Sequence, residues 1–175
     1  MIRSTTFGIC LLLAVPAAAQ SLGEKTGVDS VAGITPSTQD FVTEAAQSDM
    51  FEIKSSEAAL HSGNARIKAF AAKMIADHNK TTGELKAILT GGGVDAKLPT
   101  EVSSSQQSML GKLNGLHGND FDSQYESDQV SGHKDAVSLF QRYGKAGENA
   151  KLKAWAESTL PTLQEHLQMA QNLGE

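Results

Sequence analysis

The 175-residue sequence has one cysteine, four prolines and only 5% aromatic residues. The single cysteine, Cys10, lies in an N-terminal targeting segment, so the chain beyond it can form no internal disulfide and offers no thiolate metal ligand. No apolar run approaches the roughly 20 residues that a membrane-spanning helix needs. Strand-like alternation of polar and apolar residues is also missing. These shortages exclude a disulfide-stabilised fold and favour an all-α protein.

The first residues have the three parts of a secretory signal. Arg3 supplies the positive charge, residues 9–15 are apolar, and residues 17–19 are small alanines at a cleavage position. The pattern predicts a cleaved signal peptide over residues 1–19 and export to the periplasm. Lipidation at Cys10 is not expected, because the residue before it is a bulky isoleucine.

The remainder of the chain is long enough for one domain. Residues 20–36 are rich in Gly, Ser and Thr without periodicity and predict a flexible N-terminal segment, which leaves a helical domain over residues 37–175. Loss of Arg3 with the signal leaves 14 Lys and Arg against 20 Asp and Glu, a net charge near −6. Nucleic acid is therefore not an expected partner, because phosphate binding relies on clustered basic residues.

Apolar residues recur with helical spacing through most of this domain. Asparagine or serine residues that suit helix N-caps precede four of the periodic segments. The expected helices cover residues 38–61, 64–90, 100–116 and 119–146, with a last one from 149 that Pro161 is expected to kink. The fold this predicts is a ferritin-like four-helix bundle of two helical hairpins, joined by a long crossover that contains the extra helix.

Two of the expected helices begin with related sequences. Residues 64–71 read Asn-Ala-Arg-Ile-Lys-Ala-Phe-Ala, and residues 149–156 read Asn-Ala-Lys-Leu-Lys-Ala-Trp-Ala. Each helix later has an acid followed by a histidine on the apolar stripe, His78 in the first and His166 in the second. The repeat indicates one duplicated hairpin. The two histidines lie 14 and 17 residues after their asparagines, an offset of roughly 4–5 Å along a helix axis.

Each of the four long helices places one candidate metal ligand on its core stripe: Glu52, His78, His133 and His166. Metal sites in helical bundles are built in this way, from side chains of facing helices. Imidazole with carboxylate suits transition metals, and Zn, Fe and Cu are the candidates.

The residues around the histidines limit the kind of site. A di-iron centre of the usual ferritin-like type is disfavoured, because its Glu-x-x-His pattern is missing: Ile75 precedes His78 by three, and Leu163 precedes His166 by three. Asp77 and Glu165 point away from the histidines that follow them. Such a carboxylate can instead orient a histidine on another helix.

The opposing hypothesis is that the histidines are structural. Buried imidazoles often only donate hydrogen bonds to a neighbouring carboxylate, and the protein would then be a non-enzymatic periplasmic scaffold. His61 and His117 are expected in a helix end and a loop, without a functional role. No Gly-x-Ser-x-Gly motif or other hydrolase constellation occurs, so an enzyme is the less favoured reading. A homodimer or an envelope protein partner remains open.

The motifs on these helices resemble those of a known bacterial family. It is called domain of unknown function 4142, and its members are described as exported and ferritin-like. The resemblance covers about residues 38 to 173 and implies a helical bundle without an established activity. The matching residues are Phe41-Val42, Ala45-Ala46, Met50 to Ile53, Lys68-Ala69-Phe70-Ala71, Met74, Asp77-His78, Leu98-Pro99, Phe121-Asp122, Tyr125, His133, Leu160-Pro161-Thr162-Leu163 and Glu165-His166-Leu167.

Overall fold

The computed structural model describes residues 34–174, so the predicted signal peptide and most of the predicted N-terminal segment lie outside the described residues. Within that range the chain forms five helices and no strand, which confirms the predicted all-α class. The helices are α2 (Thr38–Ala59), α3 (Ala65–Thr90), α4 (Ser104–Asn114), α5 (Gly118–Ala146) and α6 (Ala150–Gln171). None of them is long and apolar enough to cross a membrane.

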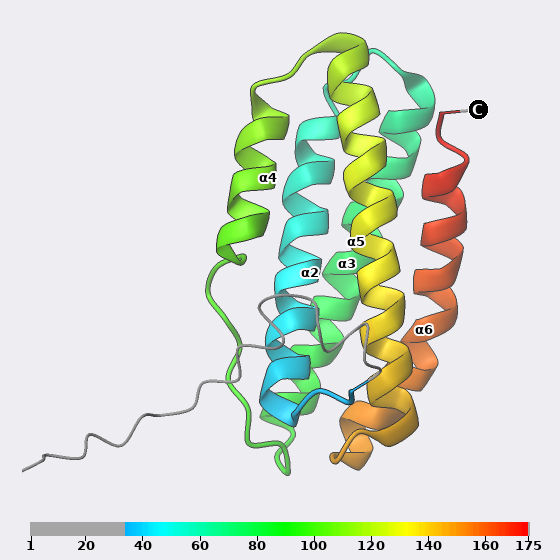
Figure 1. The fold of residues 1–175 in the computed structure, drawn as a ribbon. Coiled ribbons are helices and arrows are strands. Elements are labelled where there is room, and N and C mark those ends of the chain that lie inside the picture. Colours follow the sequence, from blue (N-terminus) through cyan, green and yellow to red (C-terminus); the bar gives the residue numbers. More distant parts are fainter. Residues whose placement is uncertain (1–33, 175) are drawn as a thin grey trace, which may run out of the picture.

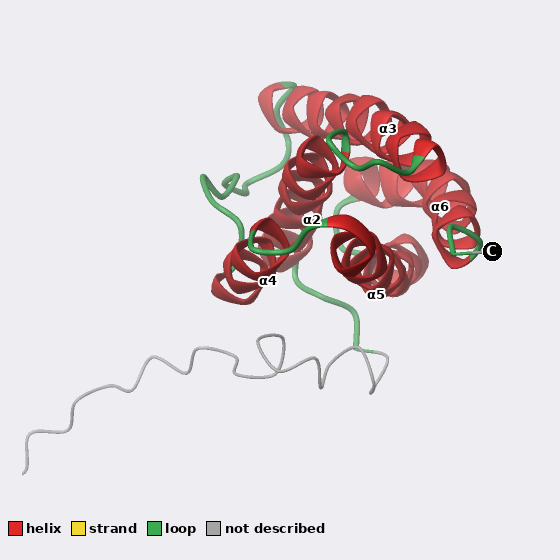
Figure 2. Cartoon of the chain, turned by 90° about the horizontal axis from the view of Figure 1, so that it is seen from above, coloured by secondary structure: helices red, strands yellow, loops and turns green. Residues whose placement is uncertain are grey.

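Two antiparallel hairpins make up the bundle, as predicted. Helices α2 and α3 form the first, α5 and α6 form the second, and the crossover with α4 returns the chain to the end where α5 begins (Figure 1). Seen along the bundle, α2, α3, α6 and α5 surround a common centre, and α4 packs outside against α2 and α5 (Figure 2). Because α3 and α6 begin at opposite ends, these two helices run antiparallel.

Local sequence determines where most of the helices begin. Asn64 and Asn149 each accept hydrogen bonds from two backbone N–H groups of the helix that follows, and Ser37 accepts one. The predicted cap at Asn119 is wrong: α5 begins one residue earlier, and His117 holds the cap position without a side-chain bond. Here Gly118, with φ +57°, provides the backbone turn into the helix.

Three other predicted features differ in detail from the structure. Helix α2 ends at Ala59 rather than His61, and α4 is shorter than predicted, because the Ser103 capping box starts it at Ser104. Pro161 lies on the exposed face of α6, and the helix continues through it.

The core consists of two apolar clusters separated by a polar layer. One cluster, at the end of the bundle where α2 begins, contains Phe41, Phe140, Tyr143 and Trp155. The other, at the opposite end, contains Phe70, Met74, Phe121 and Tyr125. Between them, every long helix contributes buried polar side chains: Asp49, Glu52, Ser55 and Ser56 from α2, His78 from α3, Asp128, Gln129 and His133 from α5, and Thr159 and His166 from α6.

Candidate metal centre

Three of the four predicted ligands meet at the middle of the bundle. His78, His133 and His166 are 1–2% exposed, and their ring centroids lie 5.4–5.6 Å apart. One nitrogen from each ring can be chosen so that all three lie within 4.8 Å of one another. A bound ion with metal–nitrogen bonds of about 2.0–2.1 Å needs nitrogens about 3–3.5 Å apart, so closure by at most about 1–2 Å would complete the geometry. We call these residues the histidine triad.

The offset of roughly 4–5 Å between His78 and His166, counted from Asn64 and Asn149, does not separate the two histidines in the structure. Counting residues from Asn64 and from Asn149 compares positions measured from opposite ends of the bundle, because α3 and α6 are antiparallel. The start of α6 instead lies beside the end of α3, where the Asn149 amide donates to the carbonyl of Gly93 at 2.8 Å. His78 lies near the middle of α3, and this is the level that His166 reaches.

Each histidine has one ring nitrogen held by an oxygen acceptor. His78 Nδ1 lies 2.8 Å from Asp49 Oδ1, and His166 Nε2 lies 2.8 Å from Asp77 Oδ2. His133 Nδ1 lies 2.9 Å from the backbone carbonyl of Gln129, one turn earlier in α5. Carboxylate and carbonyl oxygens accept hydrogen bonds, so the held nitrogen carries the proton in each ring. Metal-binding histidines are commonly oriented by these same two kinds of acceptor.

The other nitrogen of each ring is free. Nε2 of His78, Nε2 of His133 and Nδ1 of His166 are buried and have no hydrogen-bond partner among the described residues. In a neutral ring, the nitrogen opposite the protonated one has a lone pair that can accept a hydrogen bond or bind a cation. Three such lone pairs in the bundle core form a ligand set for a cation, whereas a purely structural network would pair them.

Asp49 is the site residue that the sequence reasoning missed. It is buried, and besides His78 it receives hydrogen bonds from the hydroxyls of Thr81 and Thr82, all at 2.8–2.9 Å. The helical spacing of Phe41, Ala45 and Glu52 predicts Ser48 as the inward residue of α2, but Ser48 is only partly buried and Asp49 faces the core. The Thr81-Thr82 pair on α3 was the available signal, since hydroxyls often satisfy a buried carboxylate.

Of the two acids that precede the triad histidines, one acts as predicted on another helix. Asp77 on α3 bonds His166 on α6. Glu165 contacts no triad histidine through a hydrogen bond; its carboxylate lies on the surface, 3.6 Å from the ammonium of Lys73. The two acid–histidine pairs therefore differ in role: Asp77 orients a triad histidine and Glu165 does not, because Asp49 holds the position beside His78.

Glu52, the fourth candidate ligand, lies against the triad but outside the group of converging ligand atoms. Its Oε1 is 3.9 Å from His133 Nδ1, on the side of the ring that already bonds Gln129, and its Oε2 has no partner among the described residues. Gly132 makes room for this carboxylate, since a Cβ there would lie 2.8 Å from Oε1. Burial raises the pKa of Glu52 to about 7, although the nearby charge of His78 and the Gln129 amide lower it.

The triad histidines titrate differently because their neighbours differ. Burial lowers the pKa of His133 to about 4, helped by the charge of His78. Burial likewise lowers the pKa of His166 to about 4, despite its hydrogen bond to Asp77. Burial also lowers the pKa of His78, but the hydrogen bond and charge of Asp49 outweigh it, so that this pKa is raised overall. At neutral pH, two of the three rings are therefore neutral and ready to accept a cation.

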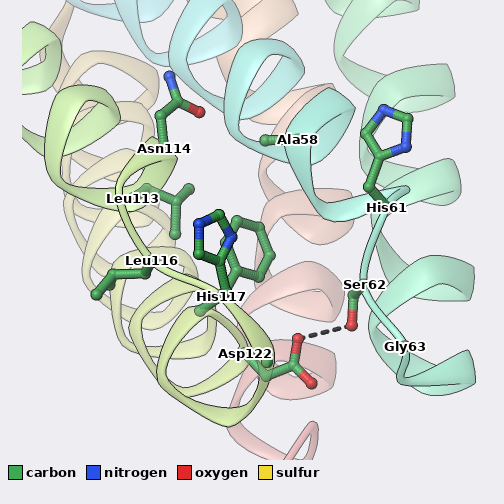
Figure 3. A pocket seen from close by; sticks show the side chains of 11 residues that line it. Ala58, His61, Ser62, Gly63, Leu113, Asn114, Leu116, His117 and Asp122 are labelled. Atoms are coloured by element: carbon green, nitrogen blue, oxygen red, sulfur yellow. Dashed lines mark hydrogen bonds between the residues drawn. The ribbon is translucent and has the colours of Figure 1, made fainter.

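A surface pocket lies elsewhere, at the end of the bundle where α3 and α5 begin. His61 and His117 are among its lining residues, and a 2.6 Å hydrogen bond joins Ser62 to Asp122 beside them (Figure 3). Within residues 34–174, the triad is the one group of three or more potential metal ligands that converge. The pocket histidines therefore do not form a second such group.

Comparison with known proteins gives a fold relative and a family. A solved structure described as "CopM in the Cu(II)-bound form" superposes with a TM-score of 0.64, at 16% sequence identity, over 79% of this chain and 95% of that chain. At this identity the likeness concerns the fold. No curated protein matches the chain. Residues 23–173 match the family described as Domain of unknown function (DUF4142), as the sequence motifs indicated, and the chain belongs to this family.

Proposed function

We propose that this chain is an exported protein that holds one first-row transition-metal ion between His78, His133 and His166. The observation that supports the proposal most directly is the free nitrogen on each of the three buried rings. The held nitrogens orient the rings, and the free ones supply the ligands. The predicted signal peptide over residues 1–19 would deliver the protein to the periplasm, where it would serve metal handling or protection of the envelope from oxidative stress.

Copper is the first ion to test. Three imidazoles without a thiolate suit Cu, Zn, Fe and Ni, and among divalent ions copper binds such sites most tightly. A protein of similar fold has been solved with Cu(II) bound. The buried carboxylate of Glu52 would neutralise part of the charge of a divalent ion, and its unpartnered Oε2 keeps it a candidate for a fourth ligand.

The test is metal binding by protein that lacks the predicted signal peptide and any histidine tag. We expect about one Cu(II) per chain by elemental analysis, and a competition assay with Zn(II) that favours copper. A nitrogen-rich coordination spectrum by electron paramagnetic resonance would identify imidazole ligands. Sub-stoichiometric uptake of every metal tried would overturn the proposal and would favour the hypothesis of a non-enzymatic scaffold instead.

Variants can remove each ligand while retaining the hydrogen bond that orients it. In His78→Asn and His133→Asn, the new side-chain amide occupies the position of Nδ1, and in His166→Gln it occupies the position of Nε2. Each variant keeps a donor for Asp49, Gln129 or Asp77 but lacks the free imidazole nitrogen. We expect each to lower metal affinity more than about 100-fold while the circular dichroism spectrum of the metal-free protein is preserved.

The two exposed histidines provide the matched control. His61→Asn with His117→Asn removes two imidazoles, one more than each triad variant does, and both positions are solvent-exposed. This double variant should bind metal as the wild type does. If this double variant lost metal binding while the triad variants kept it, the ion would bind at the surface histidines rather than at the triad.

A further inference from the structure

A metal bound at the triad must cross the layer of helices, because the three histidines are almost fully buried. The two apolar clusters close the bundle along its axis on either side of the triad. On the α2 and α5 sides, the groups next to the triad are also buried: Asp49 is 6% exposed, Glu52 1% and Gln129 0%. What remains is the lateral seam between α3 and α6.

The hydrogen-bonded surroundings of the triad reach solvent at this seam. The Asp77 side chain, which orients His166, is 29% exposed, whereas the side chain of Asp49, which orients His78, is 9% exposed. The two remaining members of the surface cluster beside Asp77 are Lys73, with a 35% exposed side chain, and Glu165, with a 59% exposed side chain. A single imidazole therefore connects the surface to the centre: His166 bonds Asp77 through Nε2, and its Nδ1 is buried and unpartnered.

A cation already sits between the two surface carboxylates. The ammonium of Lys73 lies 2.9 Å from Asp77 Oδ2 and 3.6 Å from Glu165 Oε1. The Oδ2 atom that Lys73 contacts is the same atom that accepts from His166. An incoming metal ion would be attracted by these carboxylates and would have to displace Lys73 to reach the ring.

We propose that Lys73, Asp77 and Glu165 form the gate through which metal reaches the triad. In this scheme, which rests on the proposed function, Glu165 and Asp77 capture a divalent cation at the surface. The ammonium of Lys73 swings into solvent, and the ion passes the edge of the His166 ring to reach its free Nδ1 and the free nitrogens of the other two histidines. Lys73 thus competes with the ion for the carboxylates and slows loading, while Glu165 accelerates it. Neither Lys73 nor Glu165 holds the ion in the loaded protein.

The gate is tested by the rate of Cu(II) loading, followed by stopped-flow quenching of the fluorescence of Trp155, the chain's one tryptophan. Lys73→Met should load faster than the wild type, and Glu165→Gln should load more slowly, each by roughly threefold to tenfold at low salt. Dissociation into a chelator should change in the same direction, so the equilibrium affinity stays within about threefold. High ionic strength should shrink both effects, since salt screens exposed charges.

Lys80→Met is the matched control. Lys80 also forms an ion pair four residues along α3, with Glu84 at 3.8 Å, but this pair lies outside the Lys73, Asp77 and Glu165 cluster. Its loss removes the same charge from the same helix and should leave the loading rate unchanged. Unaltered loading by both Lys73→Met and Glu165→Gln, in a wild type that binds metal, would overturn the gate alone. Absence of metal uptake by the wild type would overturn the proposed function and the gate with it.

Discussion

Each buried histidine has a partner of a different kind, and this difference controls how its ring behaves. A threonine-supported carboxylate faces His78, a half-exposed carboxylate faces His166, and a backbone carbonyl faces His133. A full charge at Asp49 favours the protonated form of its partner, whereas the neutral carbonyl beside His133 hardly opposes the cost of burying a charge. The partners therefore shift the three pKa values differently: Asp49 raises that of His78, whereas burial lowers those of His133 and His166 to about 4.

Glu52 gives a prediction for metal-free protein at this scale. Its pKa is raised from 4.5 to about 7, so the folded state retains a proton that the unfolded state loses. The proton on Glu52 therefore contributes fully to the stability of the folded state below pH 4.5, and this contribution is lost as the pH rises through 7. Glu52→Gln should not show this loss. Between pH 4.5 and pH 8, the free energy of unfolding of the variant should therefore rise by about 3 kcal/mol relative to that of the wild type.

Urea unfolding at a series of pH values, with a chelator present, measures this difference. Glu57→Gln, on the exposed face of the same helix, controls for the loss of one carboxylate. A stability difference between Glu52→Gln and the wild type that did not vary with pH would contradict the assignment.

At the scale of elements, the capping residues determine where the helices begin. Asn64 and Asn149 begin the two related helices, and each side chain satisfies backbone N–H groups that would otherwise lack a partner. The two starts lie at opposite ends of the bundle, so two related short sequences begin helices that run in opposite directions. This arrangement brings the histidine on each helix to the common polar layer.

Substitution of the caps distinguishes a true helix start from an apparent one. Asn64→Ala and Asn149→Ala should each cost about 1 kcal/mol of unfolding free energy, because two N–H groups lose their acceptor. Asn119→Ala should be neutral or stabilise by a few tenths of a kcal/mol, since Asn119 lies inside α5 and alanine is the better helix former. Thermal or urea unfolding of the three variants measures this, and a loss at Asn119 equal to the other two would restore the cap predicted there.

At the scale of the whole molecule, a metal ion would link all four helices of the bundle. The triad draws on α3, α5 and α6, and α2 contributes the carboxylate that orients His78. The polar layer interrupts the apolar core, so the metal-free protein forgoes hydrophobic contacts at its centre. A bound ion would compensate for part of that loss, because it binds the folded state alone.

Metal should therefore raise the melting temperature. At a free concentration near 100 times the dissociation constant, the gain is about 2.7 kcal/mol, which corresponds to a rise of about 5–10 °C for a domain of this size. Scanning calorimetry with and without Cu(II) provides the measurement. His166→Gln should show no rise, the His61→Asn, His117→Asn control should show the full rise, and an equal rise in both would mean that the ion stabilises the protein from another site.

The sequence by itself determined the helices and the side of each that faces the core. Asn64, Asn149 and Ser37 act on backbone groups two or three residues away, and the apolar stripes depend only on helical period, so neither requires knowledge of the fold. The same period placed His78, His133 and His166 in the interior. It could not separate Ser48 from Asp49, because neighbouring positions on a helix both lie near the edge of a stripe.

Only the tertiary structure decided what the histidines meet. The level at which antiparallel α3 and α6 face each other depends on packing along their whole length, and this level brought His166 to Asp77 rather than joining Glu165 to His78. Packing also directed Asp49 at His78 and kept Glu52 beside the held nitrogen of His133. Spacing along one helix cannot encode these contacts, since each joins side chains from two helices whose relative register is fixed by the rest of the core.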